Sequence, residues 1–342
     1  MRPSFIRGVA PAIVAFVDWL RDRTAARGVD RQESQRATCP GAPAADLRKE
    51  ETMTLDESKL SHRFTERSGV RLHYVEAGEG PLVVLLHGFP ELWYSWRHQI
   101  PALVEAGYRV IAPDMRGYNL SDKPAGVAAY ASSELTADVA ALIHAAGAER
   151  AAAVVGHDWG AGVAWPFAMR YPELLERLVI VNGPHPATML AALRTPRQLR
   201  KSWYMFFFQI PMLPELLVRW TDYAPLRASV KNDPCRPGAL TEDDLARYLE
   251  AWSQPGALTA TINYYRAAFR PSSLLDSGKP PRVDAPVLII WGEHDRYLGP
   301  EVAVPDPALA PDVRLVRIPD ASHFAHYDRP EKVNQLLLDF LR

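Results

Sequence analysis

Cysteine is scarce in this sequence, and long apolar runs are missing. The chain of 342 residues has two cysteines, Cys39 and Cys235, which lie far apart and match no metal-ligand spacing. We therefore expect neither a structural disulfide nor a metal site, and a reducing compartment is the default. The apolar stretch at residues 8–17 is shorter than the roughly twenty residues that a membrane-spanning helix needs.

An excess of either charge is also missing. The chain has 39 Lys and Arg against 40 Asp and Glu, for a net charge of −1. No Lys/Arg cluster falls on one predicted face, which argues against nucleic acid and against an anionic membrane surface as partners. With 48% hydrophobic residues, the chain can bury a large core.

The first sixty residues differ from the rest. Residues 21–52 are rich in Arg, Ala and Gln without periodicity, which is typical of linkers or disordered segments. Arg2 and Arg7 precede the short apolar run, as in a signal peptide, but no small-x-small cleavage site follows. We expect residues 1–60 to be a disordered extension or a non-native start, with Met53 as an alternative start. The expected location is cytoplasmic, and a secreted or periplasmic protein is the alternative.

Strand and helix patterns alternate from about Arg63 onward. Two alternating segments at 62–67 and 70–76 predict an edge hairpin. Apolar runs and helical spacing then predict further elements. The strands are expected at 82–86, 109–112, 151–155, 178–181, 287–290 and 313–317, and the helices at 95–106, 133–146, 161–171 and 330–341. This alternation predicts an α/β fold with a doubly wound, mostly parallel sheet.

Residues 184–278 interrupt the alternation. They contain an aromatic stretch that begins at Trp203 and further helical segments. Because the insertion lies between two strands, at the end of the sheet where ligands bind, we expect a helical lid. Residues 61–183 and 279–342 then form the core domain. Most of the lid aromatics are expected to pack within the lid itself.

An aspartate stands where a serine nucleophile is usually found. The sequence Gly156-His157-Asp158-Trp159-Gly160 lies between a predicted strand and a predicted helix, which matches the small-x-nucleophile-x-small pattern of a nucleophile elbow. The turn is so tight that larger side chains on either side would clash. A carboxylate here can displace a leaving group from saturated carbon and form an ester on the enzyme. The alternative is an aspartate that only caps the next helix.

Three further motifs follow in the order of this architecture. The loop that begins His87-Gly88 directly follows a strand, so the backbone N–H groups of Phe89 and Trp159 are candidates for an oxyanion hole. Asp295 follows one late strand and His323 follows the next. The chain order therefore predicts a triad of nucleophile, acid and histidine.

Ten histidines compete for the role of base. His323 is favoured because it follows the last strand before the final helix. His326 is a weaker rival three residues further on, and His294 adjoins the acid. His87 is expected to hold the loop after its strand by hydrogen bonds. The others lie in the hairpin, on helices, in the elbow or at the start of the insertion: His62, His73, His98, His144, His157 and His185.

From about Arg63 to the C-terminus, the chain resembles a soluble-type epoxide hydrolase of the α/β-hydrolase superfamily. The stretch HGFPELWYSWRHQ at residues 87–99 is highly specific to that family, as is DMRGY at 114–118 with SDKP at 121–124. Asn119 stands where the family usually has glycine. The resemblance implies two lid tyrosines, Tyr204 before a Phe-Gln-Ile-Pro run and Tyr265 in an Asn-Tyr-Tyr-Arg segment, with Tyr264 as the competing choice.

The resemblance implies hydrolysis of epoxides to vicinal diols through an aspartyl ester. A tyrosine, still protonated at neutral pH, can donate to the epoxide oxygen. His323, oriented by Asp295, would then activate water. The implied partners are a small apolar epoxide and water, with no metal or organic cofactor, in a monomer or homodimer. The expected pocket residues are Phe89, Trp159, Trp203 and Phe208.

Other functions remain open at this stage. A haloalkane dehalogenase shares the aspartate elbow, but it usually has Asn where this chain has Phe89, and it lacks the paired tyrosines. A fluoroacetate-type dehalogenase usually has Arg where this chain has Trp159. A serine esterase would need serine at position 158. A non-catalytic, hydrolase-like binding protein is the alternative from a different class.

Overall fold

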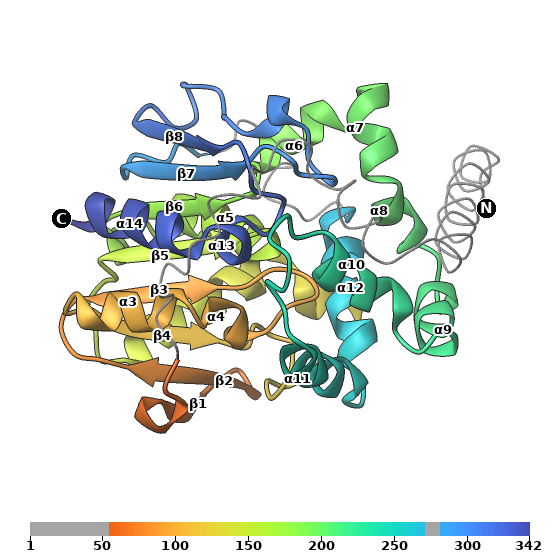
Figure 1. Ribbon diagram of the computed structural model, residues 1–342, viewed down its shortest axis with the longest axis horizontal. Helices are drawn as coiled ribbons and strands as arrows, with labels where there is room; N and C mark the ends of the chain where they lie inside the picture. The colour runs from red at the N-terminus through yellow and green to blue at the C-terminus, as the bar shows by residue number, and fades with distance from the viewer. Residues whose placement is uncertain (1–54, 271–280) are drawn as a thin grey trace.

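An eight-stranded sheet forms the centre of the part of the chain that the computed structural model describes, residues 55–270 and 281–342 (Figure 1). The spatial order is β1-β2-β4-β3-β5-β6-β7-β8. Strand β2 runs antiparallel to both of its neighbours, β1 and β4, and the remaining pairs are parallel. The strands are β1 (Ser61–Arg67), β2 (Val70–Ala77), β3 (Leu82–Leu86), β4 (Arg109–Pro113), β5 (Ala153–His157), β6 (Leu178–Val181), β7 (Val287–Gly292) and β8 (Val313–Ile318). The mostly parallel α/β fold predicted from the sequence is confirmed.

Both faces of the sheet are covered by helices (Figure 1). Successive residues of a strand point to opposite faces, so Leu82, Val84 and Leu86 pack into one core, while Val83 and Leu85 pack into the other. The first core includes helices α4 (Ser132–Ala145) and α5 (Trp159–Arg170), and the second includes α3 (Gln99–Glu105), α13 (Ala325–Asp328) and α14 (Pro330–Leu341). Short 3-10 helices complete this part: η2 (Glu57–Lys59), η3 (Trp93–Trp96), η4 (Val127–Tyr130), η5 (Pro172–Leu174) and η6 (Pro300–Val302).

The helix expected at residues 95–106 is interrupted. The chain forms η3 first and begins α3 only at Gln99. Proline has no N–H, so a helix accommodates it best in the first turn, and Pro101 falls in the first turn of α3. Strand β5 also differs from its expected bounds, because it begins at Ala153 and continues to His157. The strand therefore ends directly before Asp158.

The segment between β6 and β7 is helical, and we call α6 to α12 the inserted helices. Figure 1 shows them beyond the carboxyl ends of the parallel strands, where the active sites of such sheets lie. They are α6 (Pro186–Ala192), α7 (Pro196–Lys201), α8 (Trp203–Phe207), α9 (Leu213–Trp220), α10 (Ala224–Asn232), α11 (Glu242–Ser253) and α12 (Ala257–Ala268). The predicted domain boundaries at 183/184 and 278/279 stay predictions, since residues 271–280 lie outside the described ranges.

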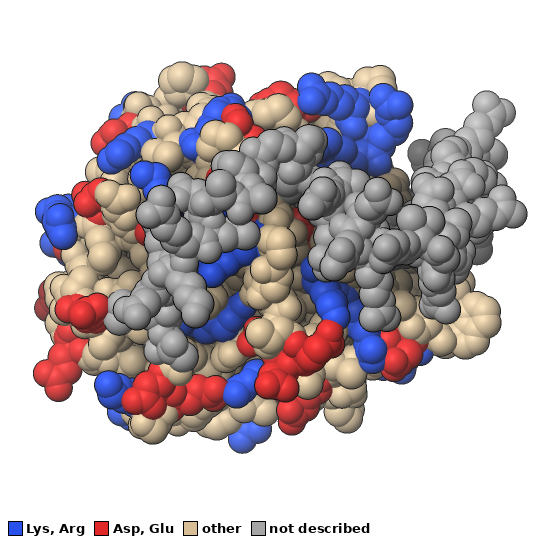
Figure 2. All heavy atoms as spheres, in the orientation of Figure 1, with Lys and Arg blue, Asp and Glu red and all other residues tan. Residues whose placement is uncertain are grey.

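The surface carries both signs of charge. On the face in Figure 2, acidic and basic side chains are interspersed, except for a basic group over α7, whose sequence contains Arg197, Arg200 and Lys201. This local group was not predicted from the sequence. No helix in the described ranges is both long and apolar enough to cross a bilayer.

Two predictions concern residues before Leu55. The expected N-terminal extension, residues 1–60, falls largely outside the described ranges, and only its last residues, including η2, are seen. Cys235 is disulfide-bonded and is not a free thiol, so the expectation of no disulfide is wrong at this residue. A disulfide depends on the distance between two Cα atoms in the fold, which separation along the chain does not reveal. Cys39 lies outside the described residues.

Candidate active site

Asp158 lies at a sharp turn between β5 and α5. Its φ of 49° and ψ of −113° are strained for a residue with a side chain. A Cβ at Gly156 would come within 2.5 Å of the Gly160 carbonyl oxygen, and one at Gly160 within 2.0 Å of the Leu86 carbonyl oxygen. The glycines are therefore a steric requirement of this turn, as the sequence pattern indicated.

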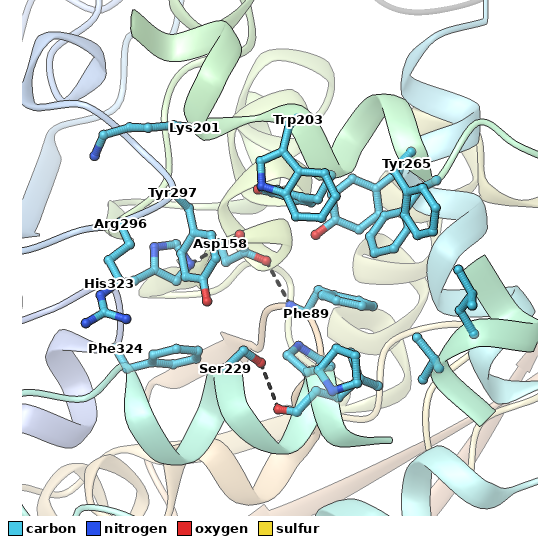
Figure 3. Close-up of a pocket in the computed structure, with 18 of the residues that line it drawn as sticks. Phe89, Asp158, Lys201, Trp203, Ser229, Tyr265, Arg296, Tyr297, His323 and Phe324 are labelled. Carbon is cyan, nitrogen blue, oxygen red and sulfur yellow. Dashed lines mark hydrogen bonds and ion pairs between the residues drawn. The ribbon is translucent and has the colours of Figure 1, made fainter. Parts of the chain in front are cut away.

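The three residues of the predicted triad meet at the carboxyl ends of their strands. His323 Nδ1 lies 2.7 Å from Asp295 Oδ2, and His323 Nε2 lies 3.4 Å from Asp158 Oδ2. Figure 3 shows the last contact as a dashed line at one wall of a cavity. The fold thus aligns acid, imidazole and elbow carboxylate in the order expected for a hydrolase triad.

Charge dominates the protonation of this triad. Burial favours neutral His323, yet the carboxylates of Asp295 and Asp158 outweigh burial and hold the pKa of the imidazole well above its usual value. Burial likewise opposes the charged form of Asp295, but His323 and several hydrogen bonds lower the pKa of this carboxyl. The two neighbouring carboxyl groups therefore favour the imidazolium form of His323 over the neutral form.

The oxygens of the Asp158 carboxylate have different partners. Oδ1 accepts a hydrogen bond of 2.8 Å from the backbone N–H of Phe89, whereas Oδ2 faces His323. Trp159 is the first residue of α5, where a backbone N–H has no acceptor within its helix. The hydrogen bonds found in the described residues do not include one from this N–H to Asp158, so its role as the second oxyanion donor stays a prediction.

Two tyrosines from the inserted helices lie near the nucleophile. The ring centroids of Tyr204 and Tyr265 are 5.8 Å apart. Burial, followed by the charge of Asp158, raises the pKa of both phenols well above the usual value, so both are protonated donors at neutral pH. Tyr264 was the competing choice, and its hydroxyl instead donates a hydrogen bond of 2.7 Å to the Arg116 carbonyl oxygen.

The cavity has two chambers that share Asp158, Tyr204 and Tyr265 in their walls. The larger has a volume of about 600 Å³ and the smaller about 250 Å³. The expected pocket residues all line one chamber or the other: Phe89, Trp203 and Phe208 line the larger, and Trp159 the smaller. The Asp158 carboxylate and the two phenols therefore line both of these mostly apolar chambers.

Comparison with known proteins agrees with this arrangement. A family model for the alpha/beta hydrolase fold matches residues 81–330. The AB hydrolase superfamily protein YfhM of Bacillus subtilis (strain 168) is 46% identical over 283 residues, which cover 82% of this chain and 97% of that protein. Epoxide hydrolase 4 of Mus musculus is 40% identical, with 80% of this chain and 77% of that protein covered.

A solved structure extends the likeness to three dimensions. It is an epoxide hydrolase from Bacillus megaterium in complex with an inhibitor, with a TM-score of 0.73 and 34% identity, covering 82% of this chain and 99% of that one. The chain belongs to the α/β-hydrolase superfamily. Within that superfamily it groups with the epoxide hydrolases, and the alternatives considered from the sequence are not favoured.

One polar residue of this α/β-hydrolase site was not predicted. Asn182 follows β6 directly, and its Nδ2 donates to Asp295 Oδ2 at 2.9 Å, while its Oδ1 accepts from the Gly292 N–H at 2.9 Å. It thereby ties the triad acid to the end of β7. The sequence feature that could have identified Asn182 is its position directly after a buried strand, which it shares with the triad residues.

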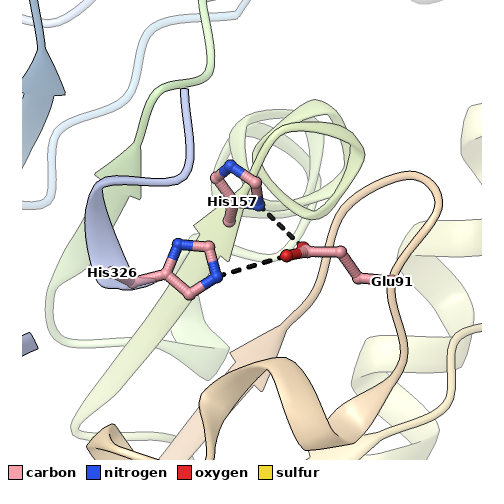
Figure 4. A group of neighbouring side chains, drawn as sticks. All are labelled: Glu91, His157 and His326. Carbon is pink, nitrogen blue, oxygen red and sulfur yellow. Dashed lines mark hydrogen bonds and ion pairs between the residues drawn. The ribbon is translucent and has the colours of Figure 1, made fainter. Parts of the chain in front are cut away.

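Glu91 connects three loops of the site and was also missed (Figure 4). Its buried carboxylate accepts hydrogen bonds of 2.8 Å from the Gly88 N–H and from His157 Nδ1, and 2.7 Å from the Tyr327 hydroxyl. Burial opposes its charge, but His157 keeps the pKa of this carboxyl well below its usual range. His157 Nε2 lies 3.0 Å from the His323 carbonyl oxygen. Glu91 thus joins the oxyanion loop, the elbow and the histidine loop.

His326 completes this buried group, with Nε2 at 3.3 Å from Glu91 Oε1. Burial lowers the pKa of His326 to about 4, and the residue packs against Glu91 rather than against Asp158. The structure therefore places His323, and not this rival, beside the nucleophile. The side chains of Glu91, His157 and His326 are of metal-ligand type, but two of their potential ligand atoms, Glu91 Oε2 and His157 Nδ1, already face each other in a hydrogen bond of 2.8 Å.

Proposed function

We propose that this chain hydrolyses epoxides to vicinal diols through a covalent ester on Asp158. The observation that carries the proposal is the placement of one carboxylate between a backbone donor, a histidine base and two protonated phenols. A carboxylate nucleophile alone would also suit a dehalogenase. Phenol donors beside it suit a poor alkoxide leaving group, which must gain a proton as its bond to carbon breaks.

Ring opening is the first step. Oδ2 of Asp158 attacks an epoxide carbon, and the bond from that carbon to the ring oxygen breaks. Tyr204 or Tyr265 gives its proton to the ring oxygen, so the product is a hydroxyalkyl ester and a tyrosinate. Oδ1 stays the carbonyl oxygen of the ester, because it is the oxygen that the Phe89 N–H holds.

Hydrolysis of the ester is the second step. Esterification removes the negative charge of Asp158, which is one of the two charges that raise the pKa of His323, so the imidazolium passes its proton through water to the tyrosinate. Neutral His323 then takes a proton from the attacking water as its oxygen bonds to Cγ of Asp158. The oxyanion forms on Oδ1, where one backbone donor contributes about 3 kcal/mol. Collapse breaks the Cγ–Oδ2 bond, and the diol leaves with Oδ2, which takes the proton from His323. The proton of the new Asp158 carboxyl group then passes to His323 and restores the resting site.

The substrate is inferred from the walls of the cavity. Aromatic and aliphatic side chains dominate both chambers, which favours a small apolar epoxide with water as the second reactant. The inserted helices supply both phenols, and we infer that residues 184–278 act as a lid on the core. Each step uses only side chains, backbone N–H groups and water.

Two assays on the purified chain separate the enzyme classes. We expect formation of phenylethanediol from styrene oxide and no halide release from a chloroalkane. Halide release without diol formation would favour a dehalogenase. A binding protein would give neither product, and the Asp158→Asn variant serves as the inactive control.

A further inference from the structure

A third phenol lies beside the triad. Tyr297 stands two residues after Asp295, and its N–H donates to Asp295 Oδ1 at 2.8 Å. Its carbonyl oxygen accepts a hydrogen bond of 2.8 Å from Gln198 Nε2 of α7. The backbone of Tyr297 is therefore held on one side by the triad acid and on the other by an inserted helix.

The ring of Tyr297 lies next to the base. Its centroid is 5.0 Å from that of His323, with the planes at 70°, and 5.9 Å from that of Tyr204. Tyr297 lines the larger chamber together with Asp158. In Figure 3 its hydroxyl points into the cavity, on the side where His323 approaches Asp158.

Ester hydrolysis needs a polar group at this place. A water held only by His323 Nε2 can rotate about that one hydrogen bond, and a second contact is needed to aim a lone pair at Cγ of Asp158. The side-chain hydroxyls that line the larger chamber belong to Tyr204, Ser229, Tyr265 and Tyr297. Ser229 donates to the Leu226 carbonyl oxygen at 2.8 Å. Among these four residues, Tyr297 is the one whose ring packs against His323.

We propose that Tyr297 is a positioning residue for the hydrolytic water. One O–H of the water donates to His323 Nε2 and the other to the Tyr297 hydroxyl oxygen, so a lone pair faces Cγ of the ester. The ring also limits the rotation of His323. This inference rests on the proposed function, since it assigns a group to the second half-reaction alone.

The test is single-turnover kinetics of Tyr297→Phe, which keeps the ring and removes the hydroxyl. The rate of ester formation, measured by acid quench and mass spectrometry, should stay within about twofold of the wild-type rate. Ester hydrolysis should slow by about ten- to a hundredfold, the range that misplacement of a reacting group produces. In the steady state, kcat and KM should fall together as the ester accumulates. Ser229→Ala, which removes another hydroxyl of the same chamber, is the matched control.

The outcomes are distinguishable. Wild-type ester hydrolysis in Tyr297→Phe would overturn the role of Tyr297 and leave the proposed function intact. Slower ester formation with normal hydrolysis would overturn it too, and would make Tyr297 a third acid for ring opening. Wild-type enzyme that forms neither ester nor diol would overturn the proposed function and this inference with it. The acid limb of the pH profile for hydrolysis should be the same in Tyr297→Phe and wild type, which shows that His323 is still in place.

Discussion

At Asp158 the two carboxylate oxygens have separate tasks. Oδ1 is fixed by the Phe89 N–H at 2.8 Å, and Oδ2 lies 3.4 Å from His323 Nε2. A carboxylate with equivalent surroundings on both oxygens could attack through either one. In the proposed mechanism, these contacts set the attacking oxygen and the oxygen of the later oxyanion before substrate binds, which is the preorganisation that lowers a barrier.

Replacing His323 by Gln should trap the reaction halfway. The variant keeps a polar side chain of similar size but cannot take a proton from water, so the ester should form and persist. Intact-mass spectrometry should show an increase equal to the mass of the epoxide, and a peptide containing Asp158 should carry it. Turnover at the wild-type rate in this variant would exclude His323 as the base.

The two phenols should act in the other half-reaction. Tyr204→Phe combined with Tyr265→Phe should slow ring opening by about a hundredfold or more, in the range of general acid catalysis, with ester hydrolysis little changed. Stopped-flow or rapid-quench kinetics measures the two rates separately.

The neighbouring Tyr264→Phe is the control for that pair. It removes a hydroxyl that donates to the Arg116 carbonyl oxygen, so it should lower stability without slowing ring opening selectively. A burst of ester in the double variant equal to that of wild type would refute the role of the tyrosines as acids.

Three loops of the site depend on one buried carboxylate. Glu91 accepts hydrogen bonds from the oxyanion loop at Gly88, from His157 before the nucleophile and from Tyr327 after the base. These loops come from distant parts of the sequence, and the strands alone do not fix their relative positions. Breaking a buried pair is costly because the partner is left charged and unpaired.

Glu91→Gln should therefore lower the free energy of unfolding by about 3 kcal/mol, the lower end of the range for breaking a buried pair. Urea denaturation at pH 7 measures this change. Glu105→Gln, at an exposed site on α3, should have little effect and is the matched control. Equal stability of the Glu91 variant and wild type would contradict the structural role of this carboxylate.

Elements with strong local signals were predicted well. The strands at 82–86 and 178–181 were found with the expected bounds, because continuous apolar runs mark buried parallel strands. The start of α3 was not predicted correctly, because the pattern of apolar residues continues across the break before Gln99. The elbow and triad positions were readable since they follow strands in a known order. The roles of Asn182, Glu91 and Tyr297 were not readable, because a side chain that each one contacts in the site (Asp295, His157 and His323, respectively) lies far away in the sequence.

At the scale of the whole molecule, several ion pairs join the inserted segment to the core, and the most buried carboxyl group among them belongs to Asp233. Asp233 follows α10, and its Oδ1 lies 3.3 Å from Nε of Arg296, the residue after the triad acid. Asp233 is only 3% exposed. Burial raises the pKa of this carboxyl to about 7, although Arg296 and His323 oppose the change.

The sign of the resulting pH dependence follows from the raised pKa. The folded chain holds the Asp233 proton up to about pH 7, whereas the unfolded chain loses it near the ordinary value of 3.8, so this residue lowers stability as pH rises from about 4 to 7. Asp233→Asn removes that titration. The free energy of unfolding of the variant, minus that of wild type, should therefore be larger at pH 8 than at pH 5, by on the order of a few kcal/mol.

Thermal unfolding at the two pH values measures this difference. Asp222→Asn is the control, because Asp222 is an exposed partner of Arg227. If the stability of Asp233→Asn and wild type changed in parallel between pH 5 and pH 8, Asp233 would not carry the proposed proton.

The most direct test of the whole account is the fate of oxygen in a single turnover. Excess enzyme is mixed with an epoxide in heavy-oxygen water, and both the diol and the peptide that contains Asp158 are analysed by mass spectrometry. The account predicts an unlabelled diol from the first turnover and one heavy oxygen in the Asp158 carboxyl group. A labelled diol with an unlabelled Asp158 would show that water attacks the epoxide directly, which contradicts the ester mechanism.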